Sequence, residues 1–327
     1  MQAVLSGMAI SFERAPMRRL LIVICLLVAA YSGYWALGRA GLVRALDAGE
    51  ARLGQSVQLT YANRATSGYP SRFDTTWRDV TLAVPGLSYR VPLVQVFALS
   101  YRPNRAILFA PGPHDVTVAG HAVRLKTDDS RASVQVVPGT ELALDKLTAQ
   151  SEKLSLLVDG AQVLTAQSAL AALHRGGPPE TRMKAYLEAN SIDLGGAVFD
   201  RVELDALLDL DTRATLRGVR PRIAALSLHT ARITAGDSHV ALGGALTVDG
   251  AGQLQGELAL TGTGWQRILD LAVQGGLLEP GIAQTWRNMG ETLSGPGALN
   301  LTLPVRNGRV LLGPVPIVIL PQLAPPR

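Results

Sequence analysis

One segment near the N-terminus constrains this chain more than any other, because it is long and apolar enough to cross a lipid bilayer. Residues 20–37, LLIVICLLVAAYSGYWAL, carry no charged side chain, and Arg14, Arg18 and Arg19 stand just before them. As an α-helix the segment would rise about 27 Å, close to the thickness of the hydrocarbon core of a membrane. It therefore predicts a single transmembrane helix.

The two ends of this segment predict its orientation. Arginines beside a span resist translocation, so residues 1–19 are expected in the cytoplasm. Tyr31, Tyr34 and Trp35 lie near the other end, where aromatic side chains commonly mark the membrane interface. We therefore expect a single-pass protein of the bacterial inner membrane with its C-terminal domain in the periplasm.

Two other interpretations of the N-terminus stay open. Val28-Ala29-Ala30 could be the cleavage site of a signal peptide. Met17 directly precedes the Arg18-Arg19 pair and is a candidate for the natural initiator. A lipoprotein is not expected, because Cys25 lies in mid-segment rather than at the end of a lipobox.

Composition limits the remaining chain. Apolar residues make up 47% of the sequence but form no second long run, so one span is expected. The chain has 1 cysteine, which lies inside the span, so no disulfide can stabilise an exported domain. A formal net charge of +5 with few interleaved aromatic residues does not favour nucleic-acid binding. The expected partner is the inner membrane, with no nucleic acid.

One basic stretch has two interpretations. Arg213, Arg217, Arg220 and Arg222 occur with no acidic residue among them. They are candidates to face anionic lipid headgroups. A solvated strand face and turn would produce the same pattern.

The pattern after the span predicts an α+β fold that is predominantly antiparallel β. Residues 38–54 have the periodicity of an amphipathic juxtamembrane helix that would hold the domain away from the membrane. Residues 55–327 then alternate as half-buried strands do, in a curved, groove-like or sandwich-like domain. The resemblance of Arg72-Phe73-Asp74 to Val198-Phe199-Asp200 suggests two similar halves, 55–177 and 191–327. Strands are expected at 75–84, 116–125, 133–137, 154–158, 202–212 and 224–233.

Turns and helices divide this pattern further. Residues 238–261 and 298–312 predict hairpins, the second with a type I′ turn at Asn307-Gly308. Three packing helices are expected, at 179–190, 263–275 and 281–293. Thr263 and Gln266 are expected to form a capping box at the start of the second helix.

No arrangement of residues predicts catalysis, so we expect no enzyme, cofactor or metal. The histidines lack metal-ligand spacing, although His114-Asp115 and His121 could meet across a hairpin. The acidic residues Glu203, Asp205, Asp209 and Asp211 fall on one face of an expected strand, and a solvated face explains them.

The string Ser67-Gly68-Tyr69-Pro70-Ser71-Arg72-Phe73-Asp74 is the most specific in the exported part. With Tyr101-Arg102-Pro103-Asn104 and Asn307-Gly308-Arg309, it resembles the bacterial domain of unknown function family 2125. The resemblance implies an N-terminal anchor, a β-rich domain and no established catalytic residues. Gly68, Tyr69, Pro70, Arg72, Phe73 and Asp74 are the motif residues it singles out.

A more distant resemblance concerns the strands of residues 224–263, which are similar in style to those of the AsmA-like envelope proteins. That similarity implies a curved β-groove that handles lipid. The first functional hypothesis is therefore a membrane-anchored periplasmic protein that binds a lipid or another hydrophobic ligand. The alternative is a structural or adaptor component of an envelope complex.

Overall fold

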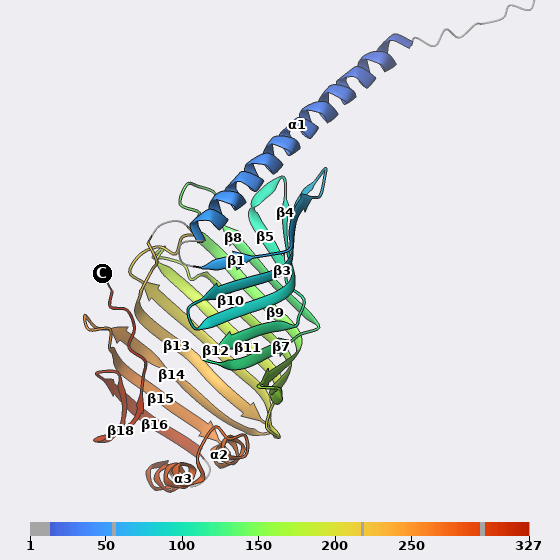
Figure 1. The fold of residues 1–327 in the computed structure, drawn as a ribbon. Helices are drawn as coiled ribbons and strands as arrows, with labels where there is room; N and C mark the ends of the chain where they lie inside the picture. Colours follow the sequence, from blue (N-terminus) through green and yellow to red (C-terminus); the bar gives the residue numbers. More distant parts are fainter. Residues whose placement is uncertain (1–13, 54–56, 217–218, 295–297, 327) are drawn as a thin grey trace, which may run out of the picture.

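A computed structural model describes residues 14–53, 57–216, 219–294 and 298–326, with burial described from residue 19 onward. A long helix leads into a large antiparallel β-sheet with two further helices (Figure 1). The expected fold class is confirmed. The described residues include one helix long and apolar enough to cross a membrane, and none of its most apolar window is buried.

The helices are α1 (Arg14–Leu53), α2 (Trp265–Gln274) and α3 (Pro280–Ser294). The strands of the first part are β1 (Gln58–Thr60), β2 (Asn63–Ser67), β3 (Arg72–Val84), β4 (Leu87–Leu99), β5 (Arg102–Phe109), β6 (His114–Val118), β7 (His121–Lys126), β8 (Asp129–Val136) and β9 (Leu144–Val158). Those of the second part are β10 (Ala161–Arg175), β11 (Arg182–Leu194), β12 (Ala197–Leu210), β13 (Ile223–Ala235), β14 (Ser238–Val248), β15 (Leu254–Thr263), β16 (Ala298–Arg306), β17 (Arg309–Leu312) and β18 (Val315–Ile319).

All these strands belong to one sheet of 18 strands. From β9 to β18 each strand pairs antiparallel with the next in the chain. Before β9, the sheet splits into two short columns. Strand β4 pairs with β5 at one end and β6 at the other, and β8 and β7 rejoin the sheet on β9. The sheet therefore runs without a break through both of the halves suggested above.

The predicted hairpins form as expected. Asn307 and Gly308 have φ values of 51° and 67°, which a type I′ turn requires. Between β14 and β15, the carboxylate of Asp249 accepts hydrogen bonds from the backbone N–H groups of Ala251 and Gln253 at 2.9 Å each. Local turn chemistry sets the register of both hairpins.

The helix predicted at residues 179–190 is wrong, because most of this segment belongs to strand β11. Met183, Ala185, Leu187 and Ala189 pair with apolar residues of β12, while the residues between them are polar. This alternation with period two serves a strand better than a helix. Pairing on both sides, with β10 and β12, outweighs the helix-start signal of Pro179.

Two smaller expectations also need correction. Residues 116–125 form the hairpin β6–β7 rather than one strand, because Ala119 and Gly120 adopt φ values of 50° and 87°. The helices at 263–275 and 281–293 are present as α2 and α3, but Thr263 does not cap α2. Its N-cap is Gly264, at φ 57°, with no side-chain hydrogen bond. Helix α2 starts from a left-handed glycine instead.

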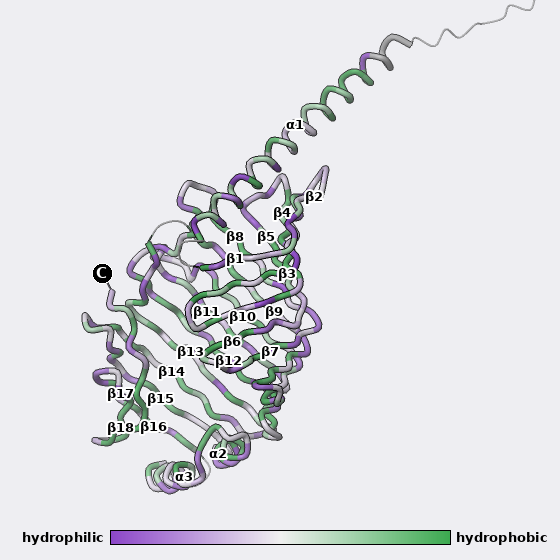
Figure 2. Tube along the Cα trace, in the orientation of Figure 1, coloured by the Kyte–Doolittle hydropathy of each residue, from purple (hydrophilic) through white to green (hydrophobic). Residues whose placement is uncertain are grey.

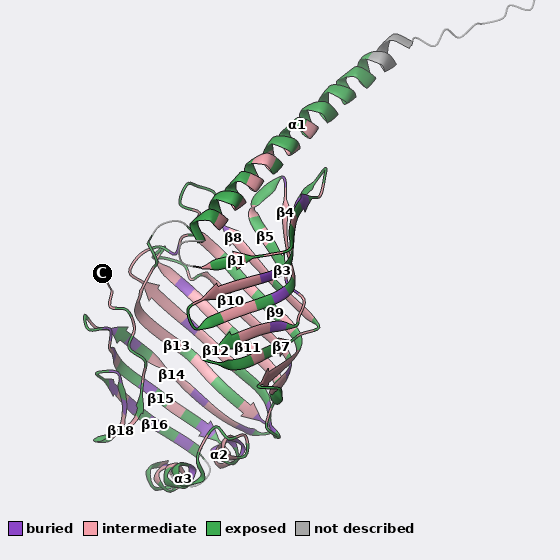
Figure 3. Ribbon diagram, in the orientation of Figure 1, coloured by how far each residue is buried: buried purple, intermediate pink, exposed green. Residues whose placement is uncertain are grey.

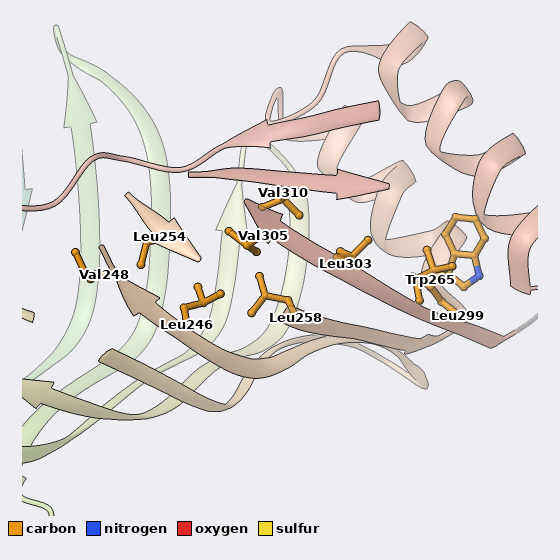
Figure 4. Packing of buried hydrophobic residues seen from close by; sticks show 10 residues of the cluster. Leu246, Val248, Leu254, Leu258, Trp265, Leu299, Leu303, Val305 and Val310 are labelled. Carbon is orange, nitrogen blue, oxygen red and sulfur yellow. The ribbon is translucent and has the colours of Figure 1, made fainter. Parts of the chain in front are cut away.

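A large core cluster lies on β14 to β16, where β17, β18, the residues that follow them and α2 pack against these strands. Leu246, Leu258, Leu303 and Val305 pack together there, and Trp265 of α2 closes the cluster (Figure 4). A second cluster joins Ile268 and Leu271 of α2 to the ends of β10, β11 and β12. These contacts confirm that the helix predicted at 263–275 packs on the sheet.

Gly290 of α3 allows this close packing, and its replacement by alanine should destabilise the protein. A Cβ at position 290 would lie 2.5 Å from Cη2 of Trp265. Overpacking of this kind costs about 1–3 kcal/mol, so we expect a lower melting temperature. Gly281→Ala is the matched control, because a Cβ there meets nothing within 4 Å. Equal melting temperatures for the two variants would contradict this packing.

Candidate functional site

One face of the sheet is apolar along a row that crosses most of its strands. Directly paired residues of an antiparallel sheet point to the same face. Starting from β5 and ending on β16, the paired residues of one row are Leu108, Ala132, Ala149, Ala171, Leu187, Leu204, Ala231, Leu242, Leu260 and Leu301. No position in this row carries a polar side chain.

The neighbouring row on the same face repeats this composition. It consists of Ala106, Val134, Leu147, Leu173, Ala185, Ala206, Leu228, Gly244, Leu258 and Leu303. The opposite face is polar in its centre, where Arg201 pairs with Glu188 and Lys184 with Asp205 at 2.8 and 2.9 Å. In its centre the sheet is therefore apolar on one face and polar on the other.

Among the described residues, no helix covers the middle of the apolar face. Leu187 is 48% exposed, Leu108 and Leu147 are each 39% exposed, and Val202 is 37% exposed. Figure 3 shows the central strands mostly at intermediate burial, and Figure 2 shows hydrophobic residues recurring along them. Contiguous exposed apolar surface of this kind usually marks a binding site.

The sheet bends around this face and leaves a cavity of about 630 Å³. Its wall includes Leu108, Ala149, Ala171 and Leu187 of the first row, with residues of β4, β6 and β7 from the part of the sheet that curls over (Figure 1). The volume lies in the range of cavities that hold small molecules. We call this concave apolar surface of β4 to β12 the trough.

The trough has a few polar groups. Tyr89 Oη lies 2.8 Å from Nδ1 of His114, and the two rings stack at 6.0 Å. Burial lowers the pKa of His114 and raises that of Tyr89. Ser130 and Ser151, also in the wall, are hydrogen bonded to each other at 2.8 Å. Few polar groups in an apolar cavity are the usual means of orienting a ligand.

Helices cover both ends of the apolar face. At the C-terminal end, α2 and α3 enclose a second apolar cavity of about 430 Å³ over Leu260 and Leu301. Trp265, 3% exposed, lies in its wall, and the Nε1–H of this residue has no hydrogen-bond partner in the described part of the chain. At the other end, Phe73 and Trp77 of β3 share the apolar face, and α1 packs on them.

The motif residues 68–74 form the docking site of α1. Gly68, at φ 107°, makes the turn in which its carbonyl accepts a hydrogen bond from the N–H of Arg72 at 2.9 Å. Phe73 stacks on Trp35 at 5.9 Å between ring centroids, and Tyr69 contacts Trp35 edge to face at 5.4 Å. The carbonyl of Pro70 accepts a hydrogen bond from Tyr31 of α1. Asp74 pairs with Arg72 at 3.1 Å and, in the described part of the chain, makes no hydrogen bond or ion pair with α1.

The three aromatic residues predicted for the membrane interface contact the domain as well. Tyr31 and Tyr34 donate hydrogen bonds to the carbonyls of Pro70 and Ser100 at 3.0 and 2.8 Å. Trp35 Nε1 donates to the carbonyl of Arg72 at 2.9 Å. Their spacing of three and four residues puts them on one helix face, which meets the domain before the predicted span ends at Leu37.

The predicted juxtamembrane segment 38–54 is helical as far as Leu53 and continuous with the apolar segment, while residue 54 lies outside the described residues. The segment packs against the domain. Glu50 accepts hydrogen bonds from Tyr61, Arg64 and Trp77 at 2.9, 2.8 and 3.3 Å. Burial opposes ionisation of Glu50, but these donors outweigh it and lower the pKa of its carboxyl. The polar side of this segment thus fastens to β2 and β3.

The arginines predicted to face headgroups are engaged within the domain. Arg213 pairs with Glu180, and the guanidinium of Arg222 donates to the carbonyl of Pro325 at 2.7 Å. Arg220 also has an interaction partner, and Arg217 lies outside the described residues. Arg213, Arg220 and Arg222 lie between β12 and β13, and Arg213 and Arg222 connect this loop to neighbouring segments of the chain.

The remaining candidate residues do not converge. His114 and His121 stand at opposite ends of the β6–β7 hairpin, since His114 pairs with Leu125 and His121 with Val118. His121 instead contacts Asp159 at 2.8 Å. Among the acids of β12, Glu203, Asp205 and Asp209 pair with Arg201, Lys184 and Arg182. Asp211 accepts a hydrogen bond from the N–H of Arg222. In the part of the chain that the structure describes, no group of three acidic, histidine or cysteine side chains could hold a metal ion.

Titration of His114 gives a prediction for the trough. Because burial lowers its pKa, the folded protein holds this proton less tightly than the unfolded chain. The stability linked to His114 is therefore complete above about pH 6.5 and is lost as pH falls through the folded pKa. We therefore expect the melting temperature to decrease as the pH is lowered from about 6.5 through the folded pKa of His114. His114→Gln should reduce this dependence of the melting temperature on pH. His239→Gln, on the opposite face, should keep it; identical slopes for all three proteins would contradict the assignment.

A protein family found in bacteria matches most of this chain. Residues 35–321 match the model of a family described as "Uncharacterized protein conserved in bacteria (DUF2125)". No curated protein and no solved structure matches. The match covers the docking site at residues 68–74, the trough and both covering helices, and it begins after Tyr31 and Tyr34. It confirms the family resemblance noted in the sequence. This chain belongs to the DUF2125 family.

Proposed function

We propose that this protein binds the acyl chains of a lipid in the trough, as a non-enzymatic protein anchored in the bacterial inner membrane with its β domain in the periplasm. The observation that carries the proposal is the uncovered apolar middle of the sheet, where Leu187 is 48% exposed. Leaving side chains of this size in water costs free energy, on the order of 25 cal/mol per Å² of apolar surface. An apolar ligand would remove that cost.

The shape of the trough supports an elongated ligand. The apolar rows extend from β5 to β16, far beyond the 630 Å³ cavity, and reach the second cavity beneath α2 and α3. Tyr89, His114 and the Ser130–Ser151 pair supply the polar groups at one place in the wall. An acyl chain would lie along the rows, and its polar end would hydrogen bond to those groups.

Helix α1 supports a membrane source for the ligand. Its apolar residues Leu20, Leu26 and Leu27 are 60–65% exposed, as expected of a helix that lipid surrounds. The same helix packs on β3 at the end of the apolar face. A lipid leaving the bilayer beside α1 would therefore first meet the end of the apolar face that leads into the trough.

One observation favours the adaptor alternative. Strand β18 pairs only with β17 among the described strands, and Val315, Val318 and Ile319 on it are 53, 44 and 78% exposed. An apolar edge strand of this kind can receive a strand from another protein. Pro316 removes one backbone N–H donor from this edge, so it weakens pairing with an added strand but does not prevent it.

Site-specific photo-crosslinking in cells separates these functions. With p-benzoylphenylalanine in place of Leu187, in the trough, we expect adducts of lipid mass on the full-length protein. Placed at the adjacent Tyr186, on the polar face, the same group should give none. Ala171 is the cross-strand partner of Leu187 and points to the same face. Ala171→Trp would therefore fill the trough beside Leu187 and should reduce the lipid adducts at least about fivefold.

The neighbouring variant Ala172→Trp, which points to the other face, is the control and should leave the adducts unchanged. Protein adducts at position 187 in place of lipid, or equal lipid adducts at positions 186 and 187, would refute lipid binding in the trough. Protein adducts from position 318 alone would favour the adaptor.

A further inference from the structure

A second site lies on the opposite face of the sheet, beside α1. Arg72, Arg102 and Arg105 surround a cavity of about 430 Å³ whose apolar wall includes Phe97, Leu99 and Ile107. Phe97 and Ile107 are paired, and each is one residue from the paired Val96 and Leu108 of the apolar face. Since successive residues of a strand point to opposite sides, this cavity is separate from the trough.

The charge around this cavity is positive. Arg72 is balanced by Asp74 at 3.1 Å. Arg102 and Arg105 are exposed, and within the described residues neither has a carboxylate partner. Two unpaired guanidinium groups over an apolar wall can bind a phosphate that carries hydrocarbon, because guanidinium is the usual partner of phosphate oxygens.

Contacts with α1 put this cavity near the end of the apolar segment of that helix. The carbonyl of Arg72 accepts the hydrogen bond from Trp35, and Ser100, just before Arg102 in the chain, accepts the one from Tyr34. Both helix residues belong to the last turns of the apolar segment. Tyr69 and Tyr101, 54% and 64% exposed, lie on the same two loops, and aromatic residues are typical of this membrane depth.

We infer that Arg102 and Arg105, with Arg72, form a binding site for the phosphate headgroup of an anionic phospholipid in the membrane that α1 crosses. The apolar wall would receive the first part of the acyl chain. Such a contact would fix how the domain is tilted on the membrane, and it does not depend on lipid entering the trough.

The test uses the full-length protein in detergent with equal amounts of phosphatidylglycerol and phosphatidylcholine added. Native mass spectrometry counts each lipid retained. We expect an excess of phosphatidylglycerol on the unmodified protein, and at least about a fivefold drop of that excess in the double variant R102Q/R105Q, because each basic residue near an anionic surface contributes about 1 kcal/mol.

The matched control is R306Q/R309Q, which removes two exposed arginines from the β16–β17 hairpin. It should retain the excess of phosphatidylglycerol. Equal losses in the two double variants would overturn the site, as would no preference between the lipids in the unmodified protein. Displacement of phosphatidylglycerol by millimolar inorganic phosphate would show a free-phosphate site and would also overturn the lipid assignment. The crosslinks from position 187 report on the trough separately.

Discussion

The unshielded apolar face of a single sheet is the constraint on which this structure depends. A sheet that is apolar on one side must cover that side with a second layer, close on itself or leave it for a ligand. Here α2 and α3 cover one end, α1 covers the other, and curvature partly shields the middle. Met183, at 2% exposed, and Leu187, at 48% exposed, lie on the same strand, so coverage changes sharply within a few residues.

The junction between α1 and the domain gives the apolar helix a structural role in positioning the domain. Hydrogen bonds from Tyr31, Tyr34 and Trp35 end on backbone carbonyls, which are present whatever side chains those loops carry. Gly38 allows the backbone of α1 to lie close to the ring of Phe73, since a Cβ at position 38 would lie 2.8 Å from Cζ of that residue. Because these contacts start within the apolar segment, they fix the place of the domain beside the helix.

These two features together explain why the proposed ligand and the inferred headgroup site are both lipidic. The trough offers an apolar surface with few polar groups. The cavity at Arg102 and Arg105 offers positive charge near the C-terminal end of the apolar segment of α1. They lie on opposite faces of β4 and β5, so one could hold the domain on the membrane while the other receives a ligand. The paired acids of β12 add nothing to either site, because their charges are already balanced on the polar face.

The sequence alone determined the apolar helix, the antiparallel β class, the hairpins at Asp249 and Asn307-Gly308, and α2 and α3, since each follows from local periodicity or turn chemistry. It misassigned Pro179 to Asn190 because a proline start resembles a helix, and only pairing with two neighbours makes that segment a strand. Alternation showed which residues of each strand share a face. Tertiary structure alone decided that the rows from Leu108 to Leu301 align, that their middle stays uncovered, and that Arg102 and Arg105 lie beside α1, because register and curvature depend on contacts between residues far apart in the chain.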